Sequence, residues 1–550
     1  MQRDGHMPIT KIDTTYHLPL TRETITATIV LISSLAAHLF CWTNILYSHD
    51  STLVNQIDVG WQIGIGRYLN PIYVHLRGTA VSPLFVGVLA TVYIGIAAVL
   101  VVRLLDLKGI PALALTGIAM STYVAVSATN ATFLHDSDVY SFSSLFAVMA
   151  VCLPVRWRNL LGYALGAVCV CISLGLYQSS IQVTVALALI SLTKDALEAK
   201  AAKDVLKRGF ALVAMILAGG ILYAIGIVIA QHATGYSIIH TYHGIDTIGD
   251  YQGLEIAPLI LKTYLVPFKK LFATPETLHA SGIAIINIFL AIASLYALVR
   301  LALAAKLSKP QLALLVFLTL MLPFGINCVY LISKGLSSLL ITYSYSFFYV
   351  WAAMLLDKLM RLHAPSPSSE EAADQQDEKR AKRAGYLGAL VLCAGAIVLV
   401  CNVGFSNQLY LTKALEEQAT ISYLTRVEDR MEQVEGYIPG ETPVVFAGSF
   451  YAVSAVWDHH DIKPKGITGF EGNLAITYFE TYGQYFRNVL GCPINIADRE
   501  TMIELIKTEQ VTEMPVFPAP NSCALIDGVM VVRISDDLQK ELDLHNAVKG

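Results

Sequence analysis

Charged side chains are scarce in this sequence, and the uncharged residues form long runs. Asp, Glu, Lys and Arg make up 15% of the chain, against about 25% in a typical soluble domain, and hydrophobic residues make up 55%. Ten runs contain no charged residue: 24–47, 79–102, 110–129, 139–155, 159–193, 209–231, 281–299, 311–332, 336–356 and 385–404. Runs of this length are typical of membrane-spanning helices, so the composition argues against a fully soluble enzyme.

An excess of positive charge is also missing. The chain has 38 Lys and Arg residues against 42 Asp and Glu residues, whereas nucleic-acid affinity comes mainly from clustered positive charge. A nucleic-acid partner is therefore not expected. Most of the nine cysteines lie within the uncharged runs and lack metal-binding spacing. Cys492 and Cys523 lie outside the runs, and they can form a disulfide if the compartment is oxidising.

The run 159–193 is too long for a single crossing. A hydrocarbon core of about 30 Å is crossed by roughly 20 helical residues, whereas this run would reach about 50 Å as one helix. Basic residues flank both of its ends, which is typical of loops inside the cell. We therefore predict a helical hairpin with its tip near Tyr177 and Gln178 at the outer surface, and eleven crossings altogether.

The distribution of basic residues predicts the orientation of the chain. Lys and Arg are concentrated in the loops that this topology places inside, so the N-terminus is predicted inside and the C-terminus outside. The predicted division is a cytoplasmic N-terminus (1–23), a transmembrane domain (24–356) with outer loops 48–78, 130–138 and 232–280, a cytoplasmic linker (357–384), a last transmembrane helix (385–404) and an extracytoplasmic domain (405–550).

Residues after 404 have the composition of a soluble domain with an excess of acidic residues. Pro443–Ala447 is predicted as a strand, 473–489 and 500–507 as helices, and 523–534 as a hairpin that turns at Asp527 and Gly528. The predicted fold is therefore a polytopic α-helical membrane protein with about eleven transmembrane helices and a small extracytoplasmic C-terminal α/β domain.

Acidic residues cluster in the first two outer loops. Asp50 follows His49 at the end of the first span, and Asp136 follows His135 two residues before Asp138. A partly desolvated carboxyl group at the membrane edge suits a general base, which is the role predicted for Asp50. Asp136 and Asp138 suit a catalytic role at sugar hydroxyl groups or the binding of Mg²⁺ or Mn²⁺. The structural alternatives are an acid that ends the hydrophobic run and a helix N-cap at Asp138.

Further candidates for substrate binding lie in the outer loops. The first loop contains Asp58, Arg67 and Tyr68. A guanidinium group can bind two phosphate oxygens at once, so Arg67 is a candidate ligand for a phosphate leaving group, and an ion pair with a nearby acid is the alternative. The loop 232–280 adds three lysines beside aromatic residues, namely Lys262, Lys269 and Lys270. Such a mixture of basic and aromatic residues is also typical of simple anchoring to lipid headgroups, which is the alternative for these lysines.

The tip of the predicted hairpin is polar. Tyr177 and Gln178 are followed by two serines. Backbone that leaves helical form at membrane depth is tolerated where it is buried in protein or lines a wet cavity. The tip is therefore a candidate binding site for the head group of a lipid-linked substrate, and hydrogen bonding within the turn is the alternative.

Four of these motifs together resemble a known family. They are His49-Asp50, Gly66-Arg67-Tyr68, Asp136-Ser137-Asp138 and Gly175-Leu176-Tyr177-Gln178-Ser179. In them the chain is similar to the bacterial glucosyltransferases typified by the serotype-converting O-antigen glucosyltransferases, which are polytopic proteins of the GT-C class. The resemblance covers residues 1–190 in motif and the later spans in layout.

The resemblance implies a GT-C-like fold and a glycosyl transfer at the outer face of the bacterial cytoplasmic membrane. A glucosyl unit would move from a polyprenyl-phosphate-linked donor to a glycan acceptor such as O-antigen, so the expected partners are the lipid bilayer, this donor and this acceptor. By analogy, Asp50 would take the proton of the acceptor hydroxyl. Arg67, helped by a loop lysine or a divalent cation at Asp136 and Asp138, would stabilise the departing phosphate.

A transporter or flippase for a lipid-linked sugar is the main alternative function. Ion-coupled carriers usually place ionisable groups near the bilayer midplane, and the uncharged runs contain no Asp, Glu, Lys or Arg. A sensor with an acidic outer domain is a third alternative, but it leaves the acids of the early loops without a role.

Overall fold

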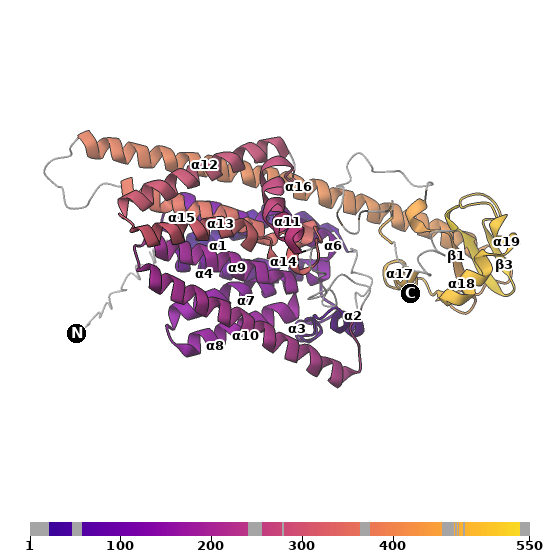
Figure 1. Cartoon of the computed structure of the whole chain (residues 1–550). Coiled ribbons are helices and arrows are strands. Elements are labelled where there is room, and N and C mark those ends of the chain that lie inside the picture. Colours follow the sequence, from indigo (N-terminus) through magenta and orange to yellow (C-terminus); the bar gives the residue numbers. More distant parts are fainter. Residues whose placement is uncertain are drawn as a thin grey trace, which may run out of the picture.

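A computed structural model of the chain describes residues 21–46, 58–239, 256–277, 280–363, 375–453, 467, 470, 472, 474–476 and 479–538. Within these ranges, eight helical segments are long and apolar enough to cross a membrane, as expected for a multi-pass membrane protein (Figure 1). They are α1 (Arg22–Asn44), α4 (Pro83–Leu105), α5 with α6 (Ile110–Thr132), η2 with α7 (Leu134–Arg156), η3 with α9 (Gln178–Leu197), α10 (Ala202–Thr234), α12 (Ala280–Ala304) and most of α16 (Lys379–Glu432).

Three further helices occupy the remaining predicted spans. They are α8 (Leu160–Leu176), α13 (Lys309–Gly325) and α15 (Ser346–His363). The first two are apolar but only 17 residues long, which is near the lower limit for a crossing. Eleven crossings therefore remain a prediction, of which eight have a helix of sufficient length and hydropathy. The short elements of the bundle are α11 (Ile256–Phe268), η6 (Lys269–Ala273), α14 (Cys328–Ile332), η7 (Leu339–Ile341) and η8 (Tyr343–Tyr345).

The long run 159–193 forms two helices that run in opposite directions, as its length predicts. Near the end of α8, the Ser173 carbonyl accepts a hydrogen bond from Ser143 near the start of α7 (Ser137–Arg156), at 2.8 Å. Thr184 of α9 (Ile181–Leu197) donates to the Ala147 carbonyl one turn further along α7, at 3.1 Å. The turn between the two helices is η3 (Gln178–Ser180).

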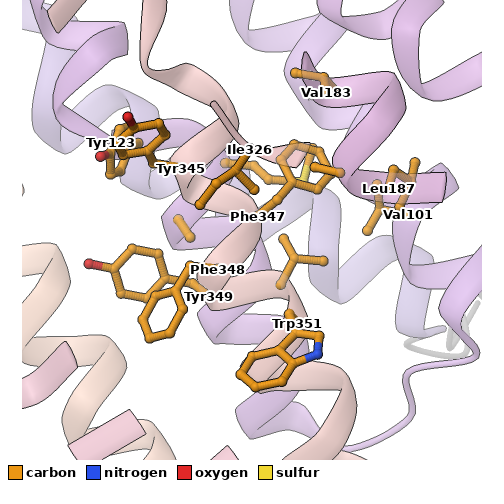
Figure 2. Packing of buried hydrophobic residues seen from close by; sticks show 14 of the residues in the cluster. Val101, Tyr123, Val183, Leu187, Ile326, Tyr345, Phe347, Phe348, Tyr349 and Trp351 are labelled. Carbon is orange, nitrogen blue, oxygen red and sulfur yellow. The ribbon is translucent and has the colours of Figure 1, made fainter. Parts of the chain in front are cut away.

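Helix α15 lies in the interior of the bundle. Its residues from Ser346 to Asp357 are all buried, because α5 (Ile110–Thr122), α9, α12 and α16 surround it. Figure 2 shows its aromatic side chains, among them Phe347 and Trp351, in the same core as residues from α4 and α9 and Ile326, which follows α13. A helix that is apolar on all sides is suited to such a core position. This central helix therefore forms the common core against which the surrounding helices pack.

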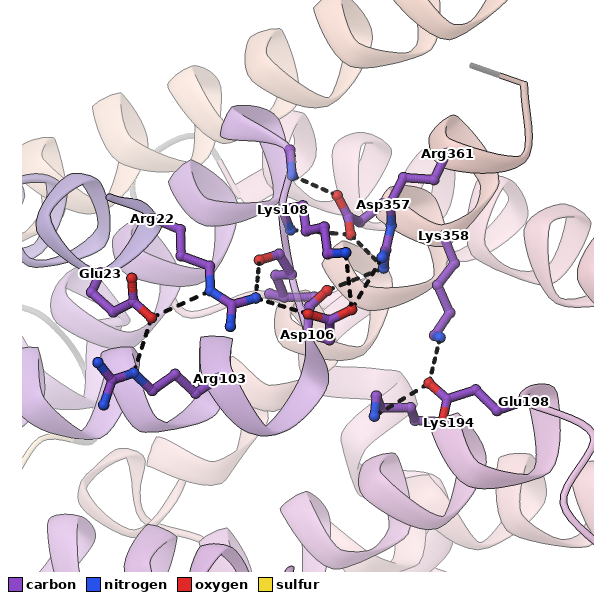
Figure 3. A network of polar contacts seen from close by, with 12 residues as sticks. Arg22, Glu23, Arg103, Asp106, Lys108, Lys194, Glu198, Asp357, Lys358 and Arg361 are labelled. Carbon is purple, nitrogen blue, oxygen red and sulfur yellow. Dashed lines mark hydrogen bonds and ion pairs between the residues drawn. The ribbon is translucent and has the colours of Figure 1, made fainter. Parts of the chain in front are cut away.

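One end of the bundle carries a cluster of ion pairs, shown in Figure 3 and called here the ion-pair cluster. Arg22 at the start of α1 contacts Asp106 after α4 at 2.8 Å, and Arg361 of α15 contacts both Asp106 and Asp357, at 3.3 and 2.9 Å. Burial acts to raise the pKa of Asp106, but the hydrogen bond from Arg22 and the neighbouring charges lower it below its usual value. The further members are Glu23, Arg103, Lys108, Lys194, Glu198 and Lys358.

Helix α16 (Gln375–Glu432) is a single helix of 58 residues. At about 1.5 Å per residue it reaches roughly 85 Å, nearly three times the thickness of a hydrocarbon core. It runs along the bundle and continues out to the C-terminal part of the chain (Figure 1). The composition predicts a last span at 385–404 and a separate domain from 405, but the helix passes through this boundary without a break.

The C-terminal part contains a four-stranded sheet in the order β2-β1-β4-β3. The strands are β1 (Pro443–Ala447), β2 (Asn495–Ile496), β3 (Cys523–Ile526) and β4 (Val529–Arg533). β1 pairs in parallel with β2 and β4, while β3 and β4 form the predicted hairpin, with Asp527 and Gly528 at positive φ in the turn.

Both faces of the sheet are covered. Residues Tyr423, Leu424 and Val427 of α16 pack against one face, together with α17 (Phe479–Tyr485) and η10 (Phe486–Leu490). The other face packs against α18 (Arg499–Ile506) and α19 (Glu509–Thr512). Strand β1 has the predicted bounds, and α18 differs from the predicted helix by one residue at each end. Cys492 and Cys523 are free thiols.

Candidate functional site

The candidate site lies at the end of the bundle opposite the ion-pair cluster. There the chain leaves α1, enters α4 and α7, and turns between α8 and α9, so residues from distant parts of the sequence meet. Two helices occupy part of the predicted first outer loop, namely α2 (Val59–Gly64) and α3 (Leu69–Arg77). Asp58 caps α2 by accepting a hydrogen bond from the backbone N–H of Trp61 at 2.8 Å, which gives this acid a structural role.

Arg67 lies in the turn between α2 and α3 and contacts the hairpin tip. Its Nε donates to Gln178 Oε1 at 3.4 Å, and its Nη1 donates to the hydroxyl of Tyr140 at 3.2 Å. The guanidinium group also lies 4.9 Å from the ring centre of Tyr177 and 5.7 Å from that of Tyr140. These contacts fix the plane of the guanidinium group, because it is hydrogen-bonded at its edge and covered by aromatic rings.

Gln178 joins the Arg67 turn to helix α10. Its amide nitrogen donates to the Ile65 carbonyl at 2.6 Å and contacts the hydroxyl of Tyr223 at 3.1 Å. The Tyr223 hydroxyl donates in turn to the carbonyl of Gly66 at 3.1 Å. The predicted tip residue therefore positions the Arg67 turn, in addition to satisfying its own hairpin.

Tyr68 packs inward beside this turn. Its ring stacks on Tyr223 with 5.9 Å between the ring centres, and burial raises the pKa of its hydroxyl far above the usual range. The Tyr68 hydroxyl packs directly against Gly226 of α10. A Cβ atom at position 226 would lie only 2.2 Å from this hydroxyl, so a larger residue there would clash with it. Tyr68 thus anchors α3 to α8 and α10, which is a structural role in the described contacts.

Asp138 forms a buried ion pair with Arg77. The Arg77 Nη1 lies 2.5 Å from Asp138 Oδ1, and the two side chains are 3% and 0% exposed. Tyr73 donates to Asp138 Oδ2 at 2.8 Å, and burial together with the charge of Asp138 raises the pKa of this tyrosine well above its usual range. The alternative prediction that Asp138 is a helix N-cap is wrong, because the N-cap residue of α7 is Asp136.

Asp136 lies next to this pair and is 9% exposed. Its Oδ2 accepts a hydrogen bond from Asn70 at 3.3 Å. The neighbouring His135 contacts the Leu46 carbonyl through Nε2 at 3.5 Å, and its own carbonyl accepts a hydrogen bond from Arg77. Both acids are therefore buried, and Asp136 is not part of the ion pair with Arg77.

The predicted divalent cation does not fit Asp136 and Asp138 as they are placed. Both oxygens of Asp138 already bind donors, namely Arg77, Tyr73 and the backbone N–H of Val139. A guanidinium group 2.5 Å from one oxygen opposes a second cation there. Within the part of the chain that the structure describes, no group of three His, Cys, Asp or Glu side chains is arranged to hold a metal ion.

His49 and Asp50 lie outside the described residues. The described chain stops at Leu46, and its last residues are tied to the site: the Leu46 N–H donates to Glu417 of α16 at 3.3 Å, and its carbonyl contacts His135. The segment that contains the predicted base therefore starts beside His135. The Trp-Asp-His-His-Asp sequence at 457–461 also lies outside the described residues.

The three predicted lysines lie on α11 and η6. Lys262 and Lys269 are exposed, and Lys270 forms an ion pair with Glu276 at 2.9 Å. The described contacts of these lysines therefore connect them with their own segment. Headgroup binding, the alternative derived from the sequence, agrees with the exposure of the first two.

Several contributors to the site were not predicted from the sequence. Three of them lie at helical spacing on α3, namely Asn70, Tyr73 and Arg77. Once 69–77 is recognised as a helix, this spacing indicates that the three side chains share one face. Tyr140 and Tyr223 lie within uncharged runs, where a tyrosine is more often part of the core, so the sequence offers no comparable signal for them.

A cavity opens beside Arg67, between α1, α4, α6 (Val124–Thr132), α7 and the α8–α9 turn. Tyr140 and Tyr177, which flank the guanidinium group, also line this cavity. Its wall includes Trp42, whose indole N–H donates to Asn130 at 3.1 Å. The site therefore combines a cation at its rim with a partly polar hollow inside the bundle.

A family model described as glucosyl transferase GtrII matches residues 39–355, more than half of the chain. The chain belongs to the GtrII family. The region matched by the GtrII model contains Arg67, Asp136, Asp138, the hairpin tip and the residues that line the cavity. This confirms the family indicated by the sequence motifs.

No curated protein matches this GtrII family member. Among solved structures, the chain is similar to the oligosaccharyltransferase of Archaeoglobus fulgidus, whose structure was determined with a tethered acceptor peptide. The identity is 11% and the TM-score 0.37, and the alignment covers 78% of this chain. It covers 62% of the oligosaccharyltransferase, so the chain spans less than two thirds of that protein's length.

Proposed function

We propose that the protein is a membrane glycosyltransferase that moves a glucosyl unit from a polyprenyl-phosphate-linked donor to a cell-surface glycan such as O-antigen. Membership of the GtrII family supports glucose as the transferred sugar. The observation that carries the proposal is the position of Arg67, held between Tyr140 and Tyr177 at the rim of a cavity and at one end of a membrane-spanning bundle. A prenyl chain stays in lipid, so its phosphate and sugar lie at this level of the membrane.

The proposed reaction is a direct substitution at the anomeric carbon. The oxygen of the acceptor hydroxyl forms a bond to this carbon, and the bond between the carbon and the phosphate oxygen breaks. The electron pair leaves with the polyprenyl phosphate, and the proton of the acceptor hydroxyl passes to Asp50 as general base. Arg67 stabilises the negative charge that develops on the leaving phosphate. Because a cation does not fit Asp136 and Asp138, the proposal contains no metal-dependent step.

The remaining residues have supporting roles in this proposal. Asp138 is a positioning residue that holds Arg77 and Tyr73, and His135 contacts the carbonyl of Leu46, the last described residue before Asp50 in the sequence. The exposed lysines of α11 and η6 bind lipid headgroups. The C-terminal part, joined to the bundle through α16, contacts the acceptor glycan. In this proposal the site faces the outer side of the bacterial cytoplasmic membrane, which is the orientation that the distribution of basic residues predicts.

Transfer of the sugar itself tests this function. The protein is reconstituted in lipid vesicles with polyprenyl-phosphate-glucose and a purified O-antigen acceptor, and the glycan is analysed by mass spectrometry. We expect the addition of one hexose per modified repeat and the release of polyprenyl phosphate. Vesicles in which the donor crosses the bilayer while the glycan mass stays constant would instead identify a flippase.

A further inference from the structure

The cavity beside Arg67 has an unusual lining for the interior of a membrane bundle. Besides aliphatic residues, it exposes hydroxyl and amide groups from four different helices and the hairpin tip. The polar lining residues that bear on its ligand are Ser34, Thr91, Asn130, Ser141, Ser144 and Ser180. A hollow with this lining has the mixed polarity of a small-molecule site.

Three of these hydroxyl groups have no protein partner. Ser34, Ser144 and Ser180 are 1%, 7% and 4% exposed, and their hydroxyls make no hydrogen bond within the ranges that the structure describes. In contrast, the preceding residue Ser33 bonds both Ser121 and the Ile29 carbonyl. A buried hydroxyl without a partner lowers stability unless a ligand or water binds it. The cavity thus presents hydrogen-bonding groups that suit a ligand rich in hydroxyls.

Ionised groups are missing from the described lining of the cavity, which contains no Asp, Glu, Lys or Arg. His38 lines it but is already bonded at both ring nitrogens, by the Ser121 carbonyl at 2.9 Å and the Tyr410 hydroxyl at 2.7 Å. A neutral imidazole satisfies both contacts, donating to the carbonyl and accepting from the phenol. A ligand with its own charge would be buried here without a counter-charge, which is unfavourable.

The position of the cavity relates it to Arg67. Tyr140 and Tyr177 form part of the cavity wall, and the guanidinium group of Arg67 lies against the same two rings. Their ring centres are 4.3 Å apart. A ligand whose phosphate binds Arg67 therefore has its next chemical group at the mouth of the cavity.

We propose that this cavity holds the sugar ring of the lipid-linked donor and selects an uncharged hexose. The inference rests on the proposed function and adds to it a place for the sugar and a rule of selectivity. The unpartnered hydroxyls of Ser34, Ser144 and Ser180 bind the hydroxyls of the sugar, and Trp42, Tyr140 and Tyr177 contact its apolar faces. A sugar that bears a carboxylate, such as a hexuronic acid, is rejected because nothing in the described lining neutralises its charge.

A comparison of the affinities for three lipids measures the contribution of the sugar separately from that of the polyprenyl phosphate. The full-length protein in nanodiscs is titrated with polyprenyl phosphate, polyprenyl-phosphate-glucose and polyprenyl-phosphate-glucuronic acid. We expect the glucose lipid to bind about tenfold more tightly than bare polyprenyl phosphate, the gain expected from one or two net hydrogen bonds. The glucuronic acid lipid should bind no more tightly than the bare lipid.

Serine-to-alanine substitutions test whether the cavity serines cause the preference for the glucose lipid. The double variant Ser34→Ala/Ser144→Ala should bind bare polyprenyl phosphate as the wild type does and lose most of its preference for the glucose lipid. Ser294→Ala is the matched control, since Ser294 of α12 is also a buried serine without a partner in the described chain but does not line the cavity. It should keep the preference.

The possible outcomes separate the cavity from the function. A double variant that keeps the full preference, or a wild type that binds the glucuronic acid lipid as tightly as the glucose lipid, overturns the cavity assignment. Equal weakening of all three lipids in the double variant also overturns it, because the serines would then support the fold or the lipid chain. A wild-type protein that binds none of the lipids contradicts the proposed function instead.

Discussion

The two ends of the helical bundle use the same types of side chain in different surroundings. In the ion-pair cluster, Arg22 and Asp106 keep 32% and 41% of their side-chain surface exposed, whereas Arg77 and Asp138 at the other end keep 3% and 0%. Exposed pairs contribute little to stability, while buried charges are costly and are tolerated only with complete hydrogen bonding. Asp357 of the ion-pair cluster is as buried as Asp138, at 1% exposure, but its partner Arg361 keeps 33% of its side-chain surface exposed. The comparison therefore concerns both partners: in the Arg77–Asp138 pair neither charge keeps contact with solvent.

The largest expected effect concerns the predicted base. Asp50→Asn should lower turnover by about 10²- to 10⁴-fold, the contribution typical of general base catalysis, while the protein inserts and folds normally. Turnover is measured with the reconstituted transfer assay and folding by thermal unfolding of the purified protein. Asp106→Asn serves as the control, because it removes an acid from the opposite end. Wild-type turnover in Asp50→Asn would exclude this residue as the base.

The second expected effect is on stability. Asp138→Asn leaves Arg77 buried without its counter-charge, so we expect the free energy of unfolding to fall by about 3–5 kcal/mol. The change is measured by denaturation of the purified protein in detergent. Combining it with Arg77→Met should restore part of the loss, because the unpaired charge is then removed as well. A single variant as stable as the wild type would show that the pair is not structurally important.

A smaller effect is expected at Arg67. Arg67→Lys keeps the positive charge but loses the planar fork and its contacts with Tyr140 and Gln178, so the KM for the donor should rise roughly tenfold with little change in thermal stability. Lys262→Arg, an exchange of the same two cations at an exposed position, should leave the KM unchanged. If Arg67→Lys leaves the donor KM as it is, Arg67 does not bind the phosphate.

The smallest effect is expected in the ion-pair cluster. The lowered pKa of Asp106 means that its contribution to stability is present above its unfolded value of about 4 and is lost as the pH falls through the still lower folded value. Asp106→Asn should therefore reduce stability by about 1 kcal/mol or less at neutral pH, and the difference from the wild type should vanish in acid. A constant difference down to low pH would contradict this linkage.

The sequence predicted the parts of the fold that depend on length and hydropathy. The hairpin at 159–193 followed from the thickness of the bilayer, and strand β1 and the Asp527–Gly528 turn followed from local pattern. The last span at 385–404 stays a prediction, and the sequence did not predict that the helix continues unbroken into the polar residues after 404. A helix can pass from lipid to water without a break, so a change in composition does not mark its end.

The candidate site was only partly predictable for a similar physical reason. Arg67 and the hairpin tip were identified because polar residues next to uncharged runs stand out. Their partners Tyr140 and Tyr223 look like ordinary core residues in the sequence, and only the packing of α7 and α10 brings them to the site. Asp136 and Asp138 are both buried, and they have different partners, Asn70 for Asp136 and Arg77 with Tyr73 for Asp138, which only the position of α3 determines.

The unbroken helix α16 sets how far the C-terminal sheet stands from the helical bundle. A residue inserted between the part of α16 that contacts the bundle and the part that packs on the sheet would move the sheet by about 1.5 Å along the helix axis and rotate it by about 100° around this axis. Reach and facing direction are thus linked, and only insertions close to whole turns preserve the facing direction. The unbroken helix therefore couples the distance of the sheet from the bundle to the direction that the sheet faces.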